Sequence, residues 1–140
     1  MSRQIRSATG RLALMPVLAA AAILVSPTMA GMSDPDPAQL ARGKRIFLYC
    51  AACHSLGGGE KDKVGPNLHD VMGAVAGTRG SFGYSTALKE SGITWTDDTL
   101  DRWLTKPSAL VPGTKMAFAG LAKGQDRADL LVYLKQATQP

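Results

Sequence analysis

Apolar residues recur with helical spacing in two segments of the chain. In residues 38–49, one face carries Leu40, Gly43, Ile46 and Phe47. In residues 126–137, an amphipathic stripe consists of Ala128, Leu130, Leu131, Tyr133, Leu134 and Ala137. A glycine inside a helix costs about 1 kcal/mol relative to alanine, so Gly43 indicates close approach of another helix. We therefore predict that these two helices, the first starting at Asp36-Pro37, pack together at Gly43.

Between these two helices the pattern changes. Residues 55–84 contain eight glycines and few periodic apolar positions, which predicts a long loop. Residues 85–89 favour a short helix that ends at Ser91-Gly92. Residues 96–106 favour a longer helix, whose N-cap, acidic first turn and stop are Thr96, Asp97 with Asp98, and Pro107. The sequence thus predicts a small all-α domain whose loop is unusually long.

The first 30 residues differ from the rest of the chain. Three arginines precede an uncharged, largely apolar run at residues 12–25, and small residues follow at Thr28-Met29-Ala30. This order is typical of a secretory signal peptide. We expect three parts: a leader at residues 1–30 cleaved after Ala30, a linker at 31–37, and one folded domain at 38–140. An alternative is that residues 12–33, which carry no charge, remain as a membrane anchor.

The formal charge of +5 at pH 7 depends on this leader. The leader holds three of the 16 Lys and Arg residues and none of the 11 Asp and Glu residues, so 13 basic and 11 acidic side chains remain, or +2. A chain with so small a positive excess is not expected to bind nucleic acid. Residues 31–140 suffice for one domain with one core.

Both cysteines of the chain lie in the run Cys50-Ala51-Ala52-Cys53-His54. The pattern Cys-x-x-Cys-His is typical of c-type haem attachment, in which two thiols bind one porphyrin and the adjoining imidazole binds the iron. A haem also accounts for the long loop, because loops can bury their apolar residues against it.

Three other interpretations of the cysteine pair fit less well. A thioredoxin-like redox pair needs a βαβ neighbourhood, which the pattern does not indicate. A zinc site needs more ligands than His69 can add. A disulfide across two residues of a helical turn would be strained.

A haem iron bound by His54 needs a sixth ligand. After the leader, the candidates are Met32, Met72, Met116 and His69. Most isolated methionines fill gaps in a core. Met116, however, lies in a Pro- and Gly-containing segment far along the chain from His54, so a loop can bring its thioether to the opposite face of the haem. We therefore favour Met116.

Further motifs follow the haem motif in a specific order. They are Val64-Gly65-Pro66-Asn67-Leu68-His69, Tyr84, Gly92-Ile93-Thr94-Trp95, Pro112-Gly113-Thr114-Lys115-Met116 and Phe118-Ala119-Gly120. In this order and spacing the chain resembles mitochondrial cytochrome c and its soluble bacterial relatives, the class I c-type cytochromes. The resemblance extends from about Ala38 to Thr138.

The resemblance implies an all-α cytochrome c fold, with several helices and long loops wrapped around one haem c that is attached through Cys50 and Cys53. By position, His54 and Met116 would be the axial ligands of the iron. The carbonyl of Pro66 would accept a hydrogen bond from the His54 ring and so orient it.

The resemblance also implies cofactor contacts from aromatic residues. Tyr84 and Trp95 match residues that bond a haem propionate, and Trp103 matches the residue beside the methionine ligand. As buried aromatics, Tyr84 and Trp95 could equally be core residues whose polar hydrogens are satisfied by other groups.

Three positions depart from the family pattern. Ala74 stands where many relatives carry an arginine near the inner propionate, and Arg79 is a candidate to supply that charge from another position. Leu88 replaces an asparagine, and Trp103 replaces a tyrosine. Because tryptophan can only donate a hydrogen bond, the network near Met116 must differ from that of the relatives.

The function implied by the resemblance is that of a periplasmic carrier of single electrons and not an enzyme, because an iron with two protein ligands has no open position for oxygen or peroxide. The expected partners are membrane complexes: a cytochrome bc-type quinol:cytochrome c reductase, and a cytochrome c oxidase or photosynthetic reaction centre.

We expect a monomer that docks transiently and with weak salt dependence. Lys115 and Lys123 match the lysine ring of the family, but Ser108 replaces a further lysine. Two alternatives stay open, namely a form tethered by residues 12–33 and a haem peroxidase or sensor in which Met116 dissociates readily.

Overall fold

The structure is a computed structural model that describes residues 34–139. This range contains five helices and no β-strand, apart from a single antiparallel bridge between Val75 and Thr94. The predicted all-α class is confirmed. The predicted leader with its cleavage site at Ala30 and the alternative anchor at residues 12–33 lie outside the described residues. Within residues 34–139, no helix is long and apolar enough to cross a membrane.

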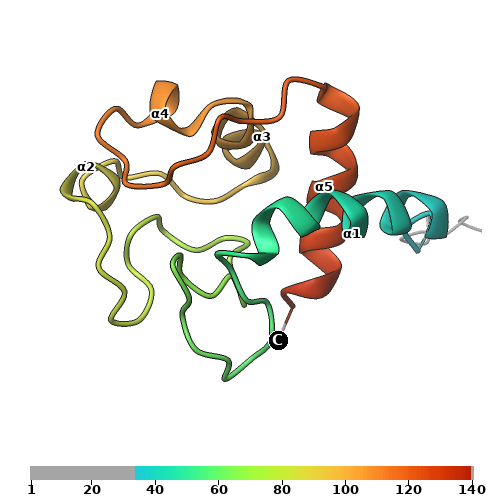
Figure 1. The fold of residues 1–140 in the computed structure, drawn as a ribbon, viewed down its shortest axis with the longest axis horizontal. Helices are drawn as coiled ribbons and strands as arrows, with labels where there is room; N and C mark the ends of the chain where they lie inside the picture. Colours follow the sequence, from blue (N-terminus) through green and yellow to red (C-terminus); the bar gives the residue numbers. More distant parts are fainter. Residues whose placement is uncertain (1–33, 140) are drawn as a thin grey trace, which may run out of the picture. The chain divides into compact units, whose positions relative to one another are not determined.

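The helices in chain order are α1 (Pro37–Ala51), α2 (Thr86–Lys89), α3 (Asp97–Thr105), α4 (Pro107–Leu110) and α5 (Gly124–Ala137) (Figure 1). Four of them are predicted by the sequence pattern, although α1 and α5 extend further than predicted. The helix α4 is not predicted. Pro107 ends α3 as expected, but it also opens α4, because the first turn of a helix tolerates its fixed φ and missing N–H.

Side-chain caps fix where α1 and α3 begin. At α1, the carboxylate of Asp36 accepts a hydrogen bond of 3.0 Å from the backbone nitrogen of Ala38. At α3, Thr96 and Thr99 form a reciprocal capping box. These contacts confirm the helix starts that the sequence predicts at Asp36 and Thr96.

The helices α1 and α5 cross and pack against each other at Gly43 (Figure 1). A β-carbon at Gly43 would overlap the carbonyl oxygen of Asp129 and lie 2.6 Å from the β-carbon of Tyr133. One turn further along α1, the rings of Phe47 and Tyr133 lie 5.7 Å apart between centroids. The predicted close packing of the two terminal helices at Gly43 is confirmed.

A buried carboxylate also joins the two terminal helices. Asp129 is only 1% exposed, and its carboxylate accepts hydrogen bonds from Arg42 at 2.6 Å and Gln125 at 2.8 Å. The hydrogen bond from Arg42 holds the pKa of Asp129 below its ordinary value in spite of burial. Asp129 therefore stays ionised and paired with α1 at neutral pH.

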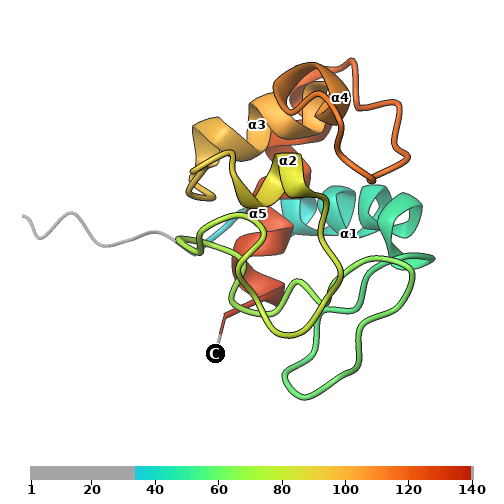
Figure 2. The ribbon, with the colours of Figure 1, turned by 90° about the vertical axis from the view of Figure 1, so that its left-hand side faces the viewer.

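The long loop between α1 and α2 is held by backbone hydrogen bonds instead of helices (Figure 2). The nitrogen of Gly65 donates to the carbonyl of Cys53 at 2.8 Å, and the nitrogen of Leu68 donates to Ser55 at 2.9 Å. Further along, the nitrogen of Asp70 donates to the carbonyl of Thr138 at 2.7 Å. The loop is thus fastened both to the end of α1 and to the end of α5.

The same loop pairs with the segment before α3. Gly73 donates to the carbonyl of Trp95 at 2.8 Å, and Trp95 donates to the carbonyl of Ala74 at 2.9 Å. One core is formed by buried apolar residues from the loop, from α1, α2, α3 and α5, and from the positions just before α3 and just after α4, namely Phe47, Val71, Ala76, Leu88, Trp95, Leu100, Trp103, Leu104, Val111, Leu130, Leu131 and Leu134. The loop is therefore part of the packed structure.

Replacing Gly43 with alanine tests the helix contact. The added methyl group must push α1 away from the Asp129 carbonyl, so we expect the free energy of unfolding to fall by about 3 kcal/mol or more. Guanidinium chloride unfolding of the haem-loaded protein, followed by circular dichroism, measures this change.

The matched control is Gly83→Ala, because a β-carbon at Gly83 meets nothing within 4 Å and its φ is not positive. We expect the control to change stability by about 0.5 kcal/mol at most. Equal effects of the two substitutions would contradict the close contact at Gly43.

Candidate functional site

The haem motif lies where α1 ends. The helix ends at Ala51, and the nitrogens of Cys53 and His54 both donate to the carbonyl of Cys50, at 3.0 and 2.9 Å. Both cysteines are half-buried and form no disulfide. Burial, and then the charge of Cys53, raises the pKa of Cys50 to about 11. A thiol with so high a pKa is unlike the activated thiolate of a thioredoxin-like redox pair.

The ring of His54 is buried and oriented by one hydrogen bond. Its Nδ1 lies 2.7 Å from the carbonyl oxygen of Pro66. Because a carbonyl can only accept, Nδ1 carries the proton and the lone pair of Nε2 is available to a metal. Burial lowers the pKa of His54, the Pro66 hydrogen bond opposes this shift, and the charge of Lys63 adds to it. The neutral tautomer that binds a metal through Nε2 is thus the favoured one.

Two residues near His54 complete its setting. A β-carbon at Gly65 would overlap the imidazole and lie 2.8 Å from Nδ1, so only glycine lets the loop pass against the ring. Lys63 donates from Nζ to the carbonyl of Ala51 at 2.9 Å, where the last carbonyls of α1 favour a cation. The sequence gives no signal for this role of Lys63, because no local pattern links it to the end of α1.

Met116 lies in the loop between α4 and α5, half-buried against the core. This loop is anchored after the methionine, where Leu121 donates to the carbonyl of Leu104 at 2.8 Å. Before it, Lys115 donates from Nζ to the carbonyl of Gly83 at 3.3 Å, which joins the loop to the segment that carries Tyr84. Met116 is therefore held by contacts on both sides.

The three aromatic candidates differ in their surroundings. Trp95 and Trp103 are buried with ring centroids 5.3 Å apart, and the Tyr84 ring packs edge-on against Phe82 at 4.9 Å. Burial and the charge of Asp62 raise the pKa of Tyr84, and Arg79 opposes this shift. Among the departures from the family pattern, Leu88 and Trp103 are buried in the core and Ala74 packs against it.

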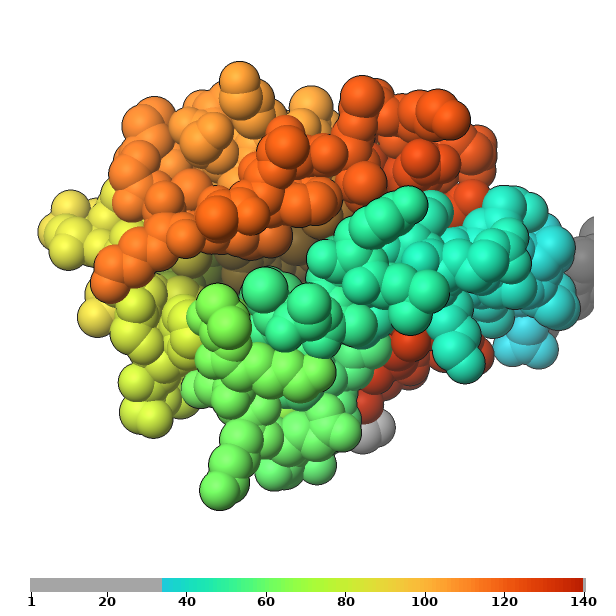
Figure 3. Space-filling model, in the orientation of Figure 1, coloured from blue at the N-terminus to red at the C-terminus, as the bar shows by residue number. Residues whose placement is uncertain are grey.

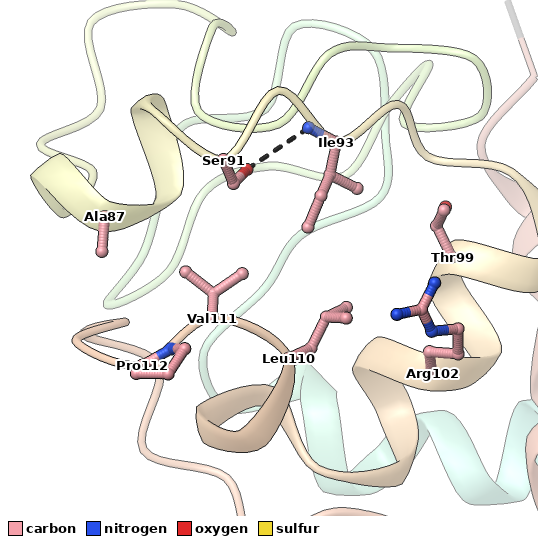
Figure 4. Close-up of a pocket in the computed structure, with 8 residues that line it drawn as sticks. All are labelled: Ala87, Ser91, Ile93, Thr99, Arg102, Leu110, Val111 and Pro112. Atoms are coloured by element: carbon pink, nitrogen blue, oxygen red, sulfur yellow. Dashed lines mark hydrogen bonds between the residues drawn. The ribbon is translucent and has the colours of Figure 1, made fainter.

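A separate hollow of about 390 Å³ opens between α2, α3 and α4 (Figure 4). Its lining residues are Ala87, Ser91, Ile93, Thr99, Arg102, Leu110, Val111 and Pro112. None of them is a predicted site residue. The one charged side chain in this wall, Arg102, is paired with Asp98 at 3.9 Å.

The residues at the end of α1 fit a covalently attached haem. Figure 3 shows a hollow between the orange segment that includes residues 111–120 and the teal-to-green segment at the end of α1. Two free thiols and a neutral imidazole follow one another at the end of this helix. These are the groups that haem attachment and proximal ligation require.

Comparison with known proteins agrees with this geometry. The cytochrome c family model matches residues 40–138. Cytochrome c2 of Rhodomicrobium vannielii is 42% identical over 127 residues, which cover 91% of this chain and 96% of the relative. Cytochrome c of Chlamydomonas reinhardtii is 47% identical over 111 residues, which cover 79% of this chain and 99% of the relative.

A solved structure is also similar. Cytochrome cH from Methylobacterium extorquens matches with a TM-score of 0.66 and 43% identity, over 69% of this chain and 97% of that chain. A family match over most of the chain, at this identity and with the same fold, shows membership and not only likeness. The chain therefore belongs to the cytochrome c family, as a class I c-type cytochrome that carries haem c attached through Cys50 and Cys53.

Proposed function

We propose that this chain is a periplasmic carrier of single electrons in which His54 and Met116 are the axial ligands of the haem iron. The observation that carries the proposal is the His54 ring, whose Nδ1 is committed to the Pro66 carbonyl at 2.7 Å and whose Nε2 is thereby available to iron. Haem c supplies the one-electron couple at this site.

The surroundings of the other candidate ligands support Met116. Met72 lines a different hollow, together with Lys135 and Thr138 near the end of α5. The Nε2 of His69 lies 3.4 Å from the carboxylate of Asp70. Met32 lies outside the described residues. The segment around Met116, in contrast, carries the fixed contacts that a ligand loop requires.

Two protein ligands on the haem iron suit an electron carrier and not an enzyme. An iron with both axial positions filled has no coordination position for oxygen or peroxide. Leu88 and Trp103, which depart from the family pattern, are buried apolar core residues and not exposed polar groups that could act on a substrate.

The periplasmic location rests on the leader. Residues 1–30 have the basic start, apolar run and small residues of a signal peptide. Attachment of haem to a Cys-x-x-Cys-His motif outside the cytoplasm, which the resemblance implies for bacteria, agrees with export. We propose that cleavage after Ala30 releases the haem domain.

Docking to membrane redox complexes is proposed to use an apolar surface beside the haem motif. Leu48, Tyr49 and Val64 are 69, 74 and 81% exposed. The first two precede Cys50 on α1, and hydrogen bonds of Lys63 and Gly65 to Ala51 and Cys53 hold Val64 near the same helix end. Such side chains suit a transient contact with a quinol:cytochrome c reductase and with an oxidase or reaction centre.

Replacing Met116 with leucine tests the axial ligand, because the volume is kept while the thioether is lost. We expect the oxidised variant to lose the weak near-infrared sulfur-to-iron absorption band and the reduced variant to bind carbon monoxide. Met72→Leu is the matched control and should leave both spectra unchanged. A wild-type protein that lacks the band or binds carbon monoxide rapidly would favour the peroxidase or sensor alternative.

Expression of the full chain in a bacterium that attaches haem tests the leader. We expect the red protein in the periplasmic fraction, with Gly31 as its first residue by N-terminal sequencing. The variant Ala30→Leu should be processed poorly, because signal peptidase requires a small residue at the cleavage site. A membrane-bound wild-type protein that retains its N-terminus would support the anchor at residues 12–33.

The double variant Leu48→Ser, Tyr49→Ser tests the docking surface. We expect the rate of reduction by a quinol:cytochrome c reductase at low protein concentration to fall about fivefold or more, with an unchanged haem spectrum. The control is Val75→Ser, which removes an apolar side chain that is 44% exposed and does not belong to the group of Leu48, Tyr49 and Val64. An unaffected rate in the double variant, together with a steep loss of rate in salt, would assign docking to the lysines.

A further inference from the structure

The guanidinium group of Arg79 is incompletely paired. The side chain as a whole is 33% exposed, yet its Nη1 atom is buried and has no hydrogen-bond partner among the described residues. It is the one side-chain nitrogen or oxygen in residues 34–139 with this property. A buried donor without an acceptor costs about 1–3 kcal/mol, and more when it is charged, so an acceptor is required at Nη1.

The nearest carboxylate does not meet this need. Asp70 Oδ2 lies 4.0 Å from Nη2 of Arg79, which is longer than a hydrogen bond and involves the other terminal nitrogen. The Asp70 carboxylate is 44% exposed and also lies 3.4 Å from His69. A half-exposed ion pair of this length contributes little. Asp70 therefore leaves Nη1 of Arg79 without an acceptor.

Arg79 shares its neighbourhood with a residue expected at the cofactor. Its charge opposes the rise in the pKa of Tyr84 that burial and Asp62 cause. The turn between Val75 and Arg79 is closed by Thr78, whose hydroxyl donates to the Val75 carbonyl at 2.8 Å. Arg79 follows this turn in the same loop that carries Tyr84.

The position that lacks a cation lies just before the same turn. Ala74 is paired through its carbonyl with Trp95, the other residue expected at a propionate, and its methyl side chain carries no charge. A haem held by Cys50 and Cys53 would bring two carboxylates to this domain, and the buried donor that lacks an acceptor among the described residues belongs to Arg79.

We propose that Nη1 of Arg79 donates a hydrogen bond to a propionate carboxylate of the haem and supplies there the positive charge that Ala74 lacks. The inference rests on the covalent attachment of haem c and not on the carrier role. A guanidinium close to the haem favours the reduced form, because the oxidised haem carries one more positive charge.

The first test is potentiometric titration of four haem-loaded variants. We expect Arg79→Gln to lower the reduction potential below that of the wild type, and Arg79→Lys to lower it less. Arg102→Gln removes the same charge from a side chain that is 60% exposed and should leave the potential nearly unchanged. Asp70→Asn removes a negative charge and should leave the potential unchanged or raise it.

The second test observes the carboxylate itself. Redox-difference infrared spectra of protein with ¹³C-labelled haem propionates should show a shifted propionate band in Arg79→Lys and Arg79→Gln, and the wild-type band in Arg102→Gln. A structural role through Asp70 alone would instead give Asp70→Asn and Arg79→Gln the same loss of stability with an unshifted band. Equal potentials in Arg79→Gln and Arg102→Gln, or an unshifted band in Arg79→Lys, would overturn the proposal.

The two proposals fail separately. Loss of the sulfur-to-iron band in the wild type would overturn the ligand assignment and the carrier role, while the propionate band would still respond to Arg79. An unshifted propionate band with an intact sulfur-to-iron band would overturn the role of Arg79 alone. If the Arg79→Gln variant does not attach haem, the Arg79→Lys variant still tests the proposal, because lysine retains the charge.

Discussion

The contact of Gly43 with the backbone of Asp129 determines the position of α1, and α1 determines the position of the cofactor. The haem motif begins at Cys50, two turns beyond Gly43 on the same rigid helix. A shift of the crossing would therefore move both thiols and the His54 ring together. The ion pair between half-exposed Arg42 and buried Asp129 adds a directional constraint, because the guanidinium donates two hydrogen bonds to the carboxylate. Gly43 and the ion pair of Arg42 with Asp129 thus determine where the haem motif lies, although neither belongs to it.

The remaining half of the site depends on backbone hydrogen bonds and not on helices. The loop after the motif has its own carbonyl and amide partners at Cys53, Ser55 and Trp95. Half of its eight glycines have a positive φ that suits turns, whereas Gly65 allows contact with the imidazole. A long loop in a small domain risks burying backbone N–H and C=O groups without partners. The backbone hydrogen bonds of this loop supply those partners. In this loop, the carbonyl of Pro66 accepts the hydrogen bond from the His54 ring.

Local patterns predicted the parts of this structure that local forces determine. The stripe that contains Phe47 and the cap at Thr96 predicted α1 and α3, and the five-residue motif predicted the haem, because each depends on neighbours in sequence. The helix α4 is not predicted because the sequence pattern indicates only that Pro107 ends α3, although a proline can also open a helix. Two further features could not be predicted, namely the contact of Lys63 with Ala51 and the unsatisfied nitrogen of Arg79. Both depend on the path of a glycine-rich loop, which is set by partners that are distant in the sequence.

The hydrogen bond from Asp70 to Thr138 joins the middle of the chain to nearly its last residue. Thr138 is 1% exposed, so this bond lies inside the packed structure. Because a chain is synthesised from its N-terminus, Cys50 and Cys53 are available long before Thr138 emerges. Until then the loop lacks the partner that fastens it to the end of α5, although its bonds to Cys53 and Ser55 can already form. The order of synthesis therefore makes both cysteines available before the bond that closes the loop against the C-terminal helix.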